Sequence, residues 1–117
     1  MLKKINVAQD FSPVLRNRNK LQTDGLYTGE EFRETFLKEA DCKEWWSNKD
    51  TITLDFDGVI TLGPSWANEA FAYFSQYGIN FEKMKKKFIF LNLTEVKKRI
   101  IENEVNEGHR GVSLAST

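Results

Sequence analysis

The chain has 117 residues, of which 40% are hydrophobic and 13% aromatic, as expected for one packed domain rather than a disordered segment. Basic and acidic residues number 17 each, so the formal net charge is zero and no overall field attracts nucleic acid or an anionic membrane. Cys42 is the only cysteine and His109 the only histidine, which excludes an intramolecular disulfide and a cysteine-based metal site.

The N-terminal residues, MLKKINVAQDF, lack the apolar segment of a signal peptide. No run in the chain approaches the ~18 apolar residues of a membrane-spanning helix. We therefore expect a cytoplasmic protein that contacts neither a membrane nor nucleic acid. We expect neither a cofactor nor a metal site.

The first part of the chain predicts a short strand followed by an irregular connection. Ile5 and Val7 alternate with polar residues, which is typical of a strand with one buried face. Residues 11–24 show no clear period. The RNRNK run at 16–20 fits a solvated loop better than a phosphate-binding segment, because only three cations are present and no aromatic residues are interleaved. Asp24-Gly25 indicates a turn.

A capping box at Thr28 predicts the first long helix. The Thr28 hydroxyl can accept the Glu31 amide, while the Glu31 carboxylate reaches back. Apolar residues then recur at helical spacing, which predicts a helix from about Gly29 into the low forties. Trp45 and Trp46 follow, and adjacent residues cannot share one helix face, so we expect one to pack inward and the other to lie at a margin.

The stretch from Thr51 to Phe74, TITLDFDGVITLGPSWANEAFAYF, predicts a strand, a loop and a helix. Apolar and polar residues alternate through Phe56, and Gly63-Pro64 marks a turn. Ser65 is placed as the N-cap of the helix, with Glu69 in the first turn near the positive end of the dipole. An apolar stripe from Trp66 onward would pack against the sheet, and Gly78 would end the helix.

The last part predicts a short helix, a strand and a final helix. Residues 80–87 form the short helix, and the apolar run 88–91 fits a buried strand. Thr94 would cap the last helix, which ends at Gly108 and whose inner face comprises Val96, Ile100, Ile101 and Val105. Residues 109–117 read as a flexible tail. The alternation predicts an α/β single domain over residues 1–108, with helices packed on a mostly parallel sheet.

Two functions can be read from LDFDGVIT. The phrase resembles the DxDG motif of haloacid-dehalogenase-like phosphatases, in which Asp55 would attack phosphate, Asp57 would act as acid/base and Mg²⁺ would neutralise the phosphate. That chemistry also needs an acidic pair after a later strand, and no such pair follows the run 88–91. The simpler interpretation places both Asp side chains at a strand end, solvated or capping nearby amides.

A second resemblance extends over most of the chain. The phrases DGLYTGEEFRETFL and ITLDFDGVITLGPSWANEAFAYF resemble the STAS-like family of unknown function, which is related to sulfate-transporter and anti-sigma-factor-antagonist domains. The matching residues are Asp24, Gly25, Tyr27, Gly29, Glu30, Phe32, Arg33, Asp55, Asp57, Gly58, Ser65, Glu69, Ala70 and Phe71.

This resemblance implies a mixed, mostly parallel sheet with packed helices and regulation through binding. In anti-sigma antagonists a Ser at the loop-helix junction is phosphorylated by a histidine-kinase-type ATPase, and Ser65 occupies the matching position. The chain has Gly63-Pro64-Ser65-Trp66 where antagonists have Asp-Ser-Ser-Gly. Two roles for Ser65 therefore stay open, a phosphoacceptor and a plain N-cap.

From the sequence we expect a non-catalytic regulatory domain that binds a protein partner through the loop 58–64 and the two adjacent helix starts. The expected contact residues are Glu30, Arg33, Asp57, Gly58, Gly63, Ser65, Trp66 and Glu69. One alternative is the Mg²⁺-dependent phosphatase using Asp55 and Asp57. Another is an assembly subunit that associates through exposed Trp residues.

Overall fold

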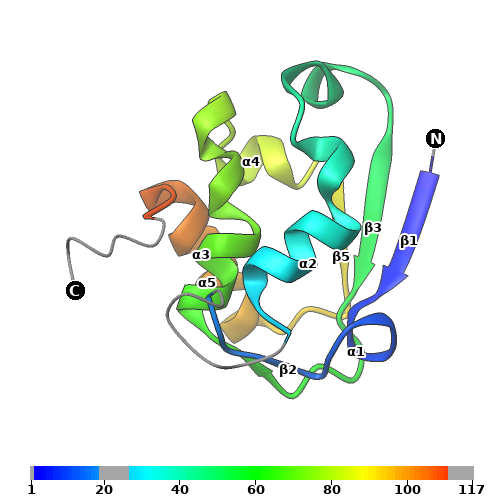
Figure 1. Ribbon diagram of the computed structural model, residues 1–117, viewed down its shortest axis with the longest axis vertical. Helices are drawn as coiled ribbons and strands as arrows, with labels where there is room; N and C mark the ends of the chain where they lie inside the picture. The colour runs from blue at the N-terminus through cyan, green and yellow to red at the C-terminus, as the bar shows by residue number, and fades with distance from the viewer. Residues whose placement is uncertain (1, 19–26, 111–117) are drawn as a thin grey trace.

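Three parallel strands form the main sheet of the computed structural model, which describes residues 2–18 and 27–110 (Figure 1). They are β1 (Leu2–Asn6), β3 (Thr51–Asp55) and β5 (Phe88–Leu91), in the order β1-β3-β5. The register aligns Ile5 with Leu54 and Leu54 with Phe90. The parallel sheet and the helices packed on it confirm the predicted α/β class.

A second, two-stranded sheet lies in segments where the sequence predicted no regular pairing. It comprises β2 (Val14–Leu15) and β4 (Thr61–Leu62), which are also parallel. Two residues per strand are too few to produce a readable period. The predicted turn at Asp24-Gly25, the end of the run 16–20 and residues 111–117 of the predicted tail lie outside the described residues.

The helices are α1 (Val7–Asp10), α2 (Gly29–Phe36), α3 (Pro64–Ala70), α4 (Phe81–Met84) and α5 (Glu95–Glu107). Helices α2, α3 and α4 are shorter than predicted, whereas α5 has its predicted cap at Thr94 and its predicted end at Gly108. Helix α2 ends where Leu37 leaves helical geometry, at φ −119° and ψ 19°, and a 3₁₀ turn, Lys38–Ala40, follows. Helix α3 likewise gives way to a 3₁₀ helix, Ala72–Tyr77.

Several predicted helix boundaries are confirmed by their hydrogen bonds. The Thr28 hydroxyl accepts the Glu31 amide at 3.0 Å, as the capping box required. Thr94 accepts the Lys97 amide at the start of α5. Gly78 ends the 3₁₀ helix with φ 76°, a left-handed conformation that glycine adopts without strain. The predicted strand residue Val7 instead begins α1, because Asn6 caps that turn through the Gln9 amide.

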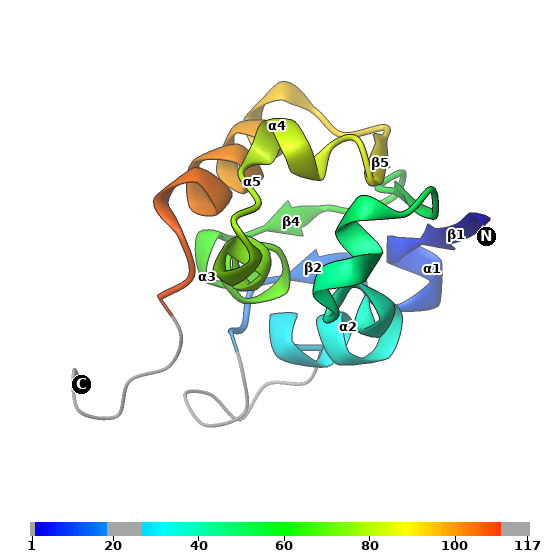
Figure 2. The same cartoon turned by 90° about the horizontal axis from the view of Figure 1, so that it is seen from above.

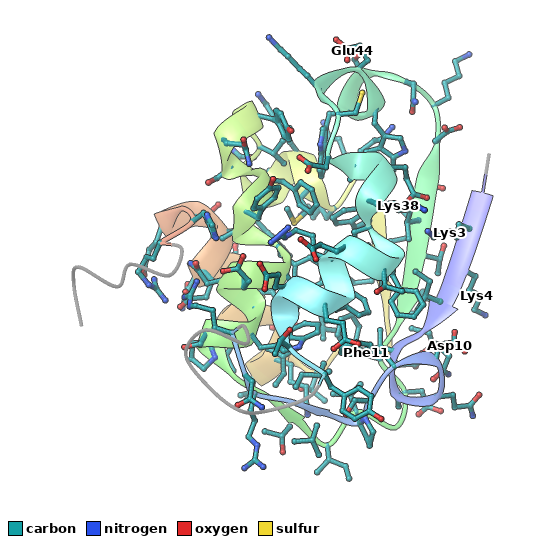
Figure 3. The ribbon with its side chains drawn as sticks, viewed as in Figure 1. Lys3, Lys4, Asp10, Phe11, Lys38 and Glu44 are labelled. Atoms are coloured by element: carbon teal, nitrogen blue, oxygen red, sulfur yellow. The ribbon has the colours of Figure 1, made fainter. Side chains whose placement is uncertain are left out.

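The core lies between the main sheet and helices α2, α3, α4 and α5, which cover the same side of it (Figures 1 and 2). Aromatic rings fill the space: Phe32 lies 5.1 Å from Trp66 between ring centroids, and Phe71 lies 5.7 Å from Phe90. Phe11 lies beside the first turns of α2 (Figure 3), where its ring contacts that of Phe32 edge to face.

The opposite side of the main sheet carries partly exposed side chains. On this side Thr53 aligns with Ile89, and Asp55 aligns with Leu91. Ile89 and Leu91 are 36% and 37% exposed. The prediction of a buried strand at 88–91 is therefore wrong on this face, because alternate side chains of β5 point away from the core.

The tryptophans do not form an exposed surface. Trp66 and Trp45 are buried, and Trp46 is half-buried with its indole N–H donating to the Ala40 carbonyl at 2.8 Å. Trp45 and Trp46 lie in the 3₁₀ turn Lys43–Ser47, one inward and one at the margin, as predicted. The expectation that exposed Trp side chains drive assembly is wrong. The placement of Val96 on the inner face of α5 is also wrong, since it is 71% exposed.

Candidate functional site

Asp55 and Asp57 stand where β3 ends, as the motif predicted. The Asp55 Oδ1 atom accepts two hydrogen bonds, from the Asp57 amide at 2.9 Å and from the Asn92 side chain at 2.8 Å. These donors hold the pKa of Asp55 below its ordinary value, the Asn92 amide having the larger effect. Asp55 Oδ1, an atom of the nucleophile in the phosphatase alternative, therefore fixes the loop after β3 and connects it to the loop after β5.

The loop that follows is fixed through its backbone. Gly58 adopts φ 88°, and the Val59 amide donates to the Phe56 carbonyl at 3.0 Å. The Ile60 and Gly63 amides then donate to the Pro13 and Leu15 carbonyls, both at 2.7 Å. Pairing of β2 with β4 thus holds the whole segment against residues 13–15.

Ser65 is the second residue of helix α3, two positions after the N-cap. The N-cap is Gly63, and Pro64 occupies the first helical position, where its fixed φ and missing N–H fit well. The predicted N-cap role of Ser65 is wrong for this reason. The Ser65 side chain is exposed, whereas Trp66, the next residue, is fully buried and donates through its indole N–H to the Tyr27 carbonyl.

We define the exposed loop as residues 57–65. Within it Asp57, Gly58, Ile60, Pro64 and Ser65 are exposed. Ile60 is 71% exposed, and it is one of few large apolar side chains that project so far from the described surface. The loop therefore combines a fixed backbone with solvent-facing side chains, which suits recognition of a partner without rearrangement.

Glu69, expected at the docking surface, is instead the centre of a buried ion-pair cluster. Its Oε2 atom lies 2.8 Å from Arg33 Nη2, and its Oε1 atom lies 3.1 Å from Arg18 Nη1. Arg33 Nε also donates to the Glu69 carbonyl at 3.1 Å, and its guanidinium lies 3.7 Å from the centre of the Tyr73 ring. All three charged side chains are buried.

The same cluster includes His109, which the sequence placed in a tail. His109 Nε2 lies 3.2 Å from Glu69 Oε1, and the His109 amide donates to Ser75 Oγ at 3.2 Å. Burial opposes ionisation of Glu69, but His109 and Arg33 outweigh it, so the pKa of Glu69 lies below its ordinary value. The cluster therefore joins α2, α3 and the segment after α5.

Asn68 extends the buried polar cluster toward α5. Its side-chain N–H donates to Glu104 Oε1 at 3.1 Å and to the Gly108 carbonyl at 2.9 Å, while its Oδ1 accepts from Arg18 and from the Arg110 amide. Arg110 also pairs with Glu104. The sequence analysis did not predict this buried polar cluster. The signal that could have indicated it is the polar pair Asn68-Glu69 within an otherwise apolar helical stripe.

The expected contact residues thus fall into two groups. Arg33, Trp66 and Glu69 are buried and do not reach the surface. The others are Glu30, Asp57, Gly58, Gly63 and Ser65, which are exposed or half-buried. Glu30 donates its amide to the Arg18 carbonyl at the start of α2. The structure therefore brings the motif residues together around α3, with one group buried and the other exposed or half-buried.

Within residues 2–18 and 27–110, no group of three or more His, Cys, Asp and Glu side chains is arranged to hold a metal ion. Within the same ranges, no helix has the length and apolar character needed to cross a bilayer.

Among known families, a family model described as a STAS-like domain of unknown function matches residues 28–98, from the cap of α2 into α5. No curated protein and no solved structure matches the chain.

Proposed function

The chain belongs to the family of STAS-like domains of unknown function, and on that premise we propose that it is a cytoplasmic regulatory domain that binds a protein partner. The domain carries no catalytic site of its own. The exposed loop is the contact surface, and the buried Glu69 cluster fixes the helices that present it.

The observation that carries this proposal is the contrast between backbone and side chains in the exposed loop. Its backbone is held by the Pro13 and Leu15 carbonyls. Several of its side chains nevertheless face solvent, and Ile60 offers an apolar contact at 71% exposure. A preformed loop with an exposed apolar residue loses little conformational entropy on binding.

Phosphorylation of Ser65 is the proposed switch. The hydroxyl is exposed on the first turn of α3, so a kinase can reach it. A phosphate would add about −1.5 to −2 charges to the contact surface, which opposes docking by repulsion and desolvation. By resemblance to anti-sigma-factor antagonists, the partner is a histidine-kinase-type ATPase that both binds the loop and modifies Ser65.

The switch is tested by recovering partners from the native host with immobilised wild-type, Ser65→Ala and Ser65→Asp proteins. We expect Ser65→Ala to retain the partner and Ser65→Asp to lose most of it. Ser47→Asp is the matched control, because Ser47 is also exposed but lies in the 3₁₀ turn Lys43–Ser47. Equal recovery of the partner by Ser65→Ala and Ser65→Asp would contradict the proposal that phosphorylation of Ser65 controls binding.

A second experiment tests the alternative chemistry. Purified wild type is incubated with an aryl phosphate and Mg²⁺ beside Asp55→Asn. Hydrolysis that disappears in Asp55→Asn would replace the binding proposal with the phosphatase. We expect no difference between the two, since Asp55 Oδ1 already accepts two hydrogen bonds within the protein.

A further inference from the structure

The outer edge of β5 is an unpaired strand edge among the described residues. The Ile52 amide donates to the Lys87 carbonyl and the Phe56 amide to the Leu91 carbonyl, so these carbonyls face β3. Backbone groups alternate along a strand, and the N–H and C=O groups of Phe88 and Phe90 therefore point away from β3. No other described strand pairs with this edge.

A groove runs beside this edge, between α4 and the start of α5. Its volume is about 550 Å³, and its lining residues are Phe81, Lys85, Lys86, Ile89, Phe90, Leu93, Glu95 and Lys98. The rings of Phe81 and Phe90 stack with centroids 5.9 Å apart and form an apolar floor. The groove thus offers apolar surface directly next to free backbone groups.

The charges around the groove have a small positive excess. Three lysines and one glutamate line it, and Lys85 pairs with Glu82 at 3.0 Å. With Glu82 included, the local charge is three positive against two negative. Lys86 and Lys98 are the cations that favour a negatively charged ligand.

We propose that the β5 edge binds an extended, acidic segment of another protein as an added strand. The partner's backbone would pair with Phe88 and Phe90, its apolar side chains would enter the groove, and its carboxylates would meet Lys86 and Lys98. This site uses different elements from the exposed loop and stands independently of the proposed function.

A second copy of the chain is the alternative occupant of this edge. Two β5 strands related by a two-fold axis would pair antiparallel, so the lysines that precede one strand would lie near the residues that follow the other. Lys86 and Lys98 line the groove and match the charge of an acidic segment, and the oligomeric state distinguishes the two occupants.

The test uses a fluorescent synthetic peptide in which Glu and Val alternate, added to the full chain at low salt. Fluorescence anisotropy reports binding, and amide chemical shifts locate it. We expect saturable binding with shifts at Phe88 and Phe90. The same peptide with Lys in place of Glu, or with Pro at its central Val, should bind at least ~tenfold more weakly.

Charge-reversal variants complete the test. Lys86→Glu with Lys98→Glu should weaken binding roughly tenfold or more. Lys38→Glu with Lys43→Glu is the matched control, because both lysines are exposed, lie on 3₁₀ turns and line no part of the groove (Lys38 is labelled in Figure 3). Equal weakening by the two pairs would overturn the proposal.

Two other outcomes also contradict it. If no saturable binding occurs, the lysines only protect an exposed edge from aggregation. If ultracentrifugation shows a dimer and the amide shifts on dimerisation fall at Phe88 and Phe90, the edge is covered by a second copy.

Discussion

The exposed loop ends only a few residues before Glu69, the centre of the buried cluster, yet the two regions differ in almost every physical respect. In the loop the backbone is held, and the side chains of Asp57, Ile60 and Ser65 face solvent. In the cluster the charged side chains are enclosed and paired with one another. The comparison shows that one short segment, residues 57–69, can supply both an exposed surface and a buried ion pair that connects two helices.

The two regions also meet their hydrogen-bonding needs differently. Among the described residues, no buried side-chain nitrogen or oxygen lacks a hydrogen-bond partner. The cluster achieves this through side chains from segments far apart in the chain, such as Arg18, Glu69 and His109. A substitution there disturbs several elements, whereas one in the loop disturbs mainly what the loop contacts.

Removing the charge of Glu69 should have the largest effect. Glu69→Gln keeps the size of the side chain but leaves Arg18 and Arg33 buried without a carboxylate. We expect the free energy of unfolding to fall by about 3–5 kcal/mol in urea denaturation. Asp57→Asn, the same change on the exposed loop, should alter it by less than about 0.5 kcal/mol. Equal losses in the two variants would remove the distinction between the regions.

A methyl group at Gly29 should have the next largest effect. A Cβ there would lie 2.5 Å from the Trp66 carbonyl oxygen and 3.1 Å from Glu69 Cβ, where α2 and α3 approach. Gly29→Ala should lower the free energy of unfolding by about 1–3 kcal/mol.

Gly63→Ala is the control on the exposed loop, since its nearest non-neighbouring atom would be 3.6 Å away. At this helix N-cap the expected cost is below about 1 kcal/mol. If thermal or urea denaturation ranks Gly63→Ala as the more damaging change, the close contact of α2 with α3 does not limit stability.

Acid should weaken the cluster through Glu69. Its pKa is lower in the folded protein than its ordinary value of 4.5, so folding favours the carboxylate. This contribution is complete above about pH 4.5 and disappears as the pH falls through the lower, folded pKa. Urea denaturation as a function of pH should show a shallower acid slope for Glu69→Gln than for wild type. Identical slopes would mean that Glu69 does not contribute.

Local patterns predicted the elements best where one short interaction decides them. The Thr28 capping box, the Thr94 cap and the stop at Gly78 depend on neighbours in sequence, and all three are present. The start of α3 was misplaced, because Ser65 is a good capping residue but Pro64 fits better inside the first turn. The β2–β4 pair was missed, since two-residue strands carry no period.

The candidate site was predicted only in part. Asp57, Gly58 and Ser65 are exposed as expected, but Arg33 and Glu69 are buried. Charged residues are rarely buried unless they are paired, so the sequence favours an exposed position for each of them. Their burial depends on Arg18 and His109, which lie 51 and 40 residues from Glu69.

The sequence by itself determined the family, the α/β class and several helix boundaries, because these follow from residue identity and short-range periodicity. Only the tertiary structure decided which motif residues are buried and which are exposed. Burial of a charge depends on partners brought together by folding, and exposure of an edge such as β5 depends on which strands lie beside it. The pattern of segment 51–74 therefore predicts a strand, a loop and a helix. Packing decides which of its polar residues are exposed, as Ser65 is, and which are buried, as Glu69 is.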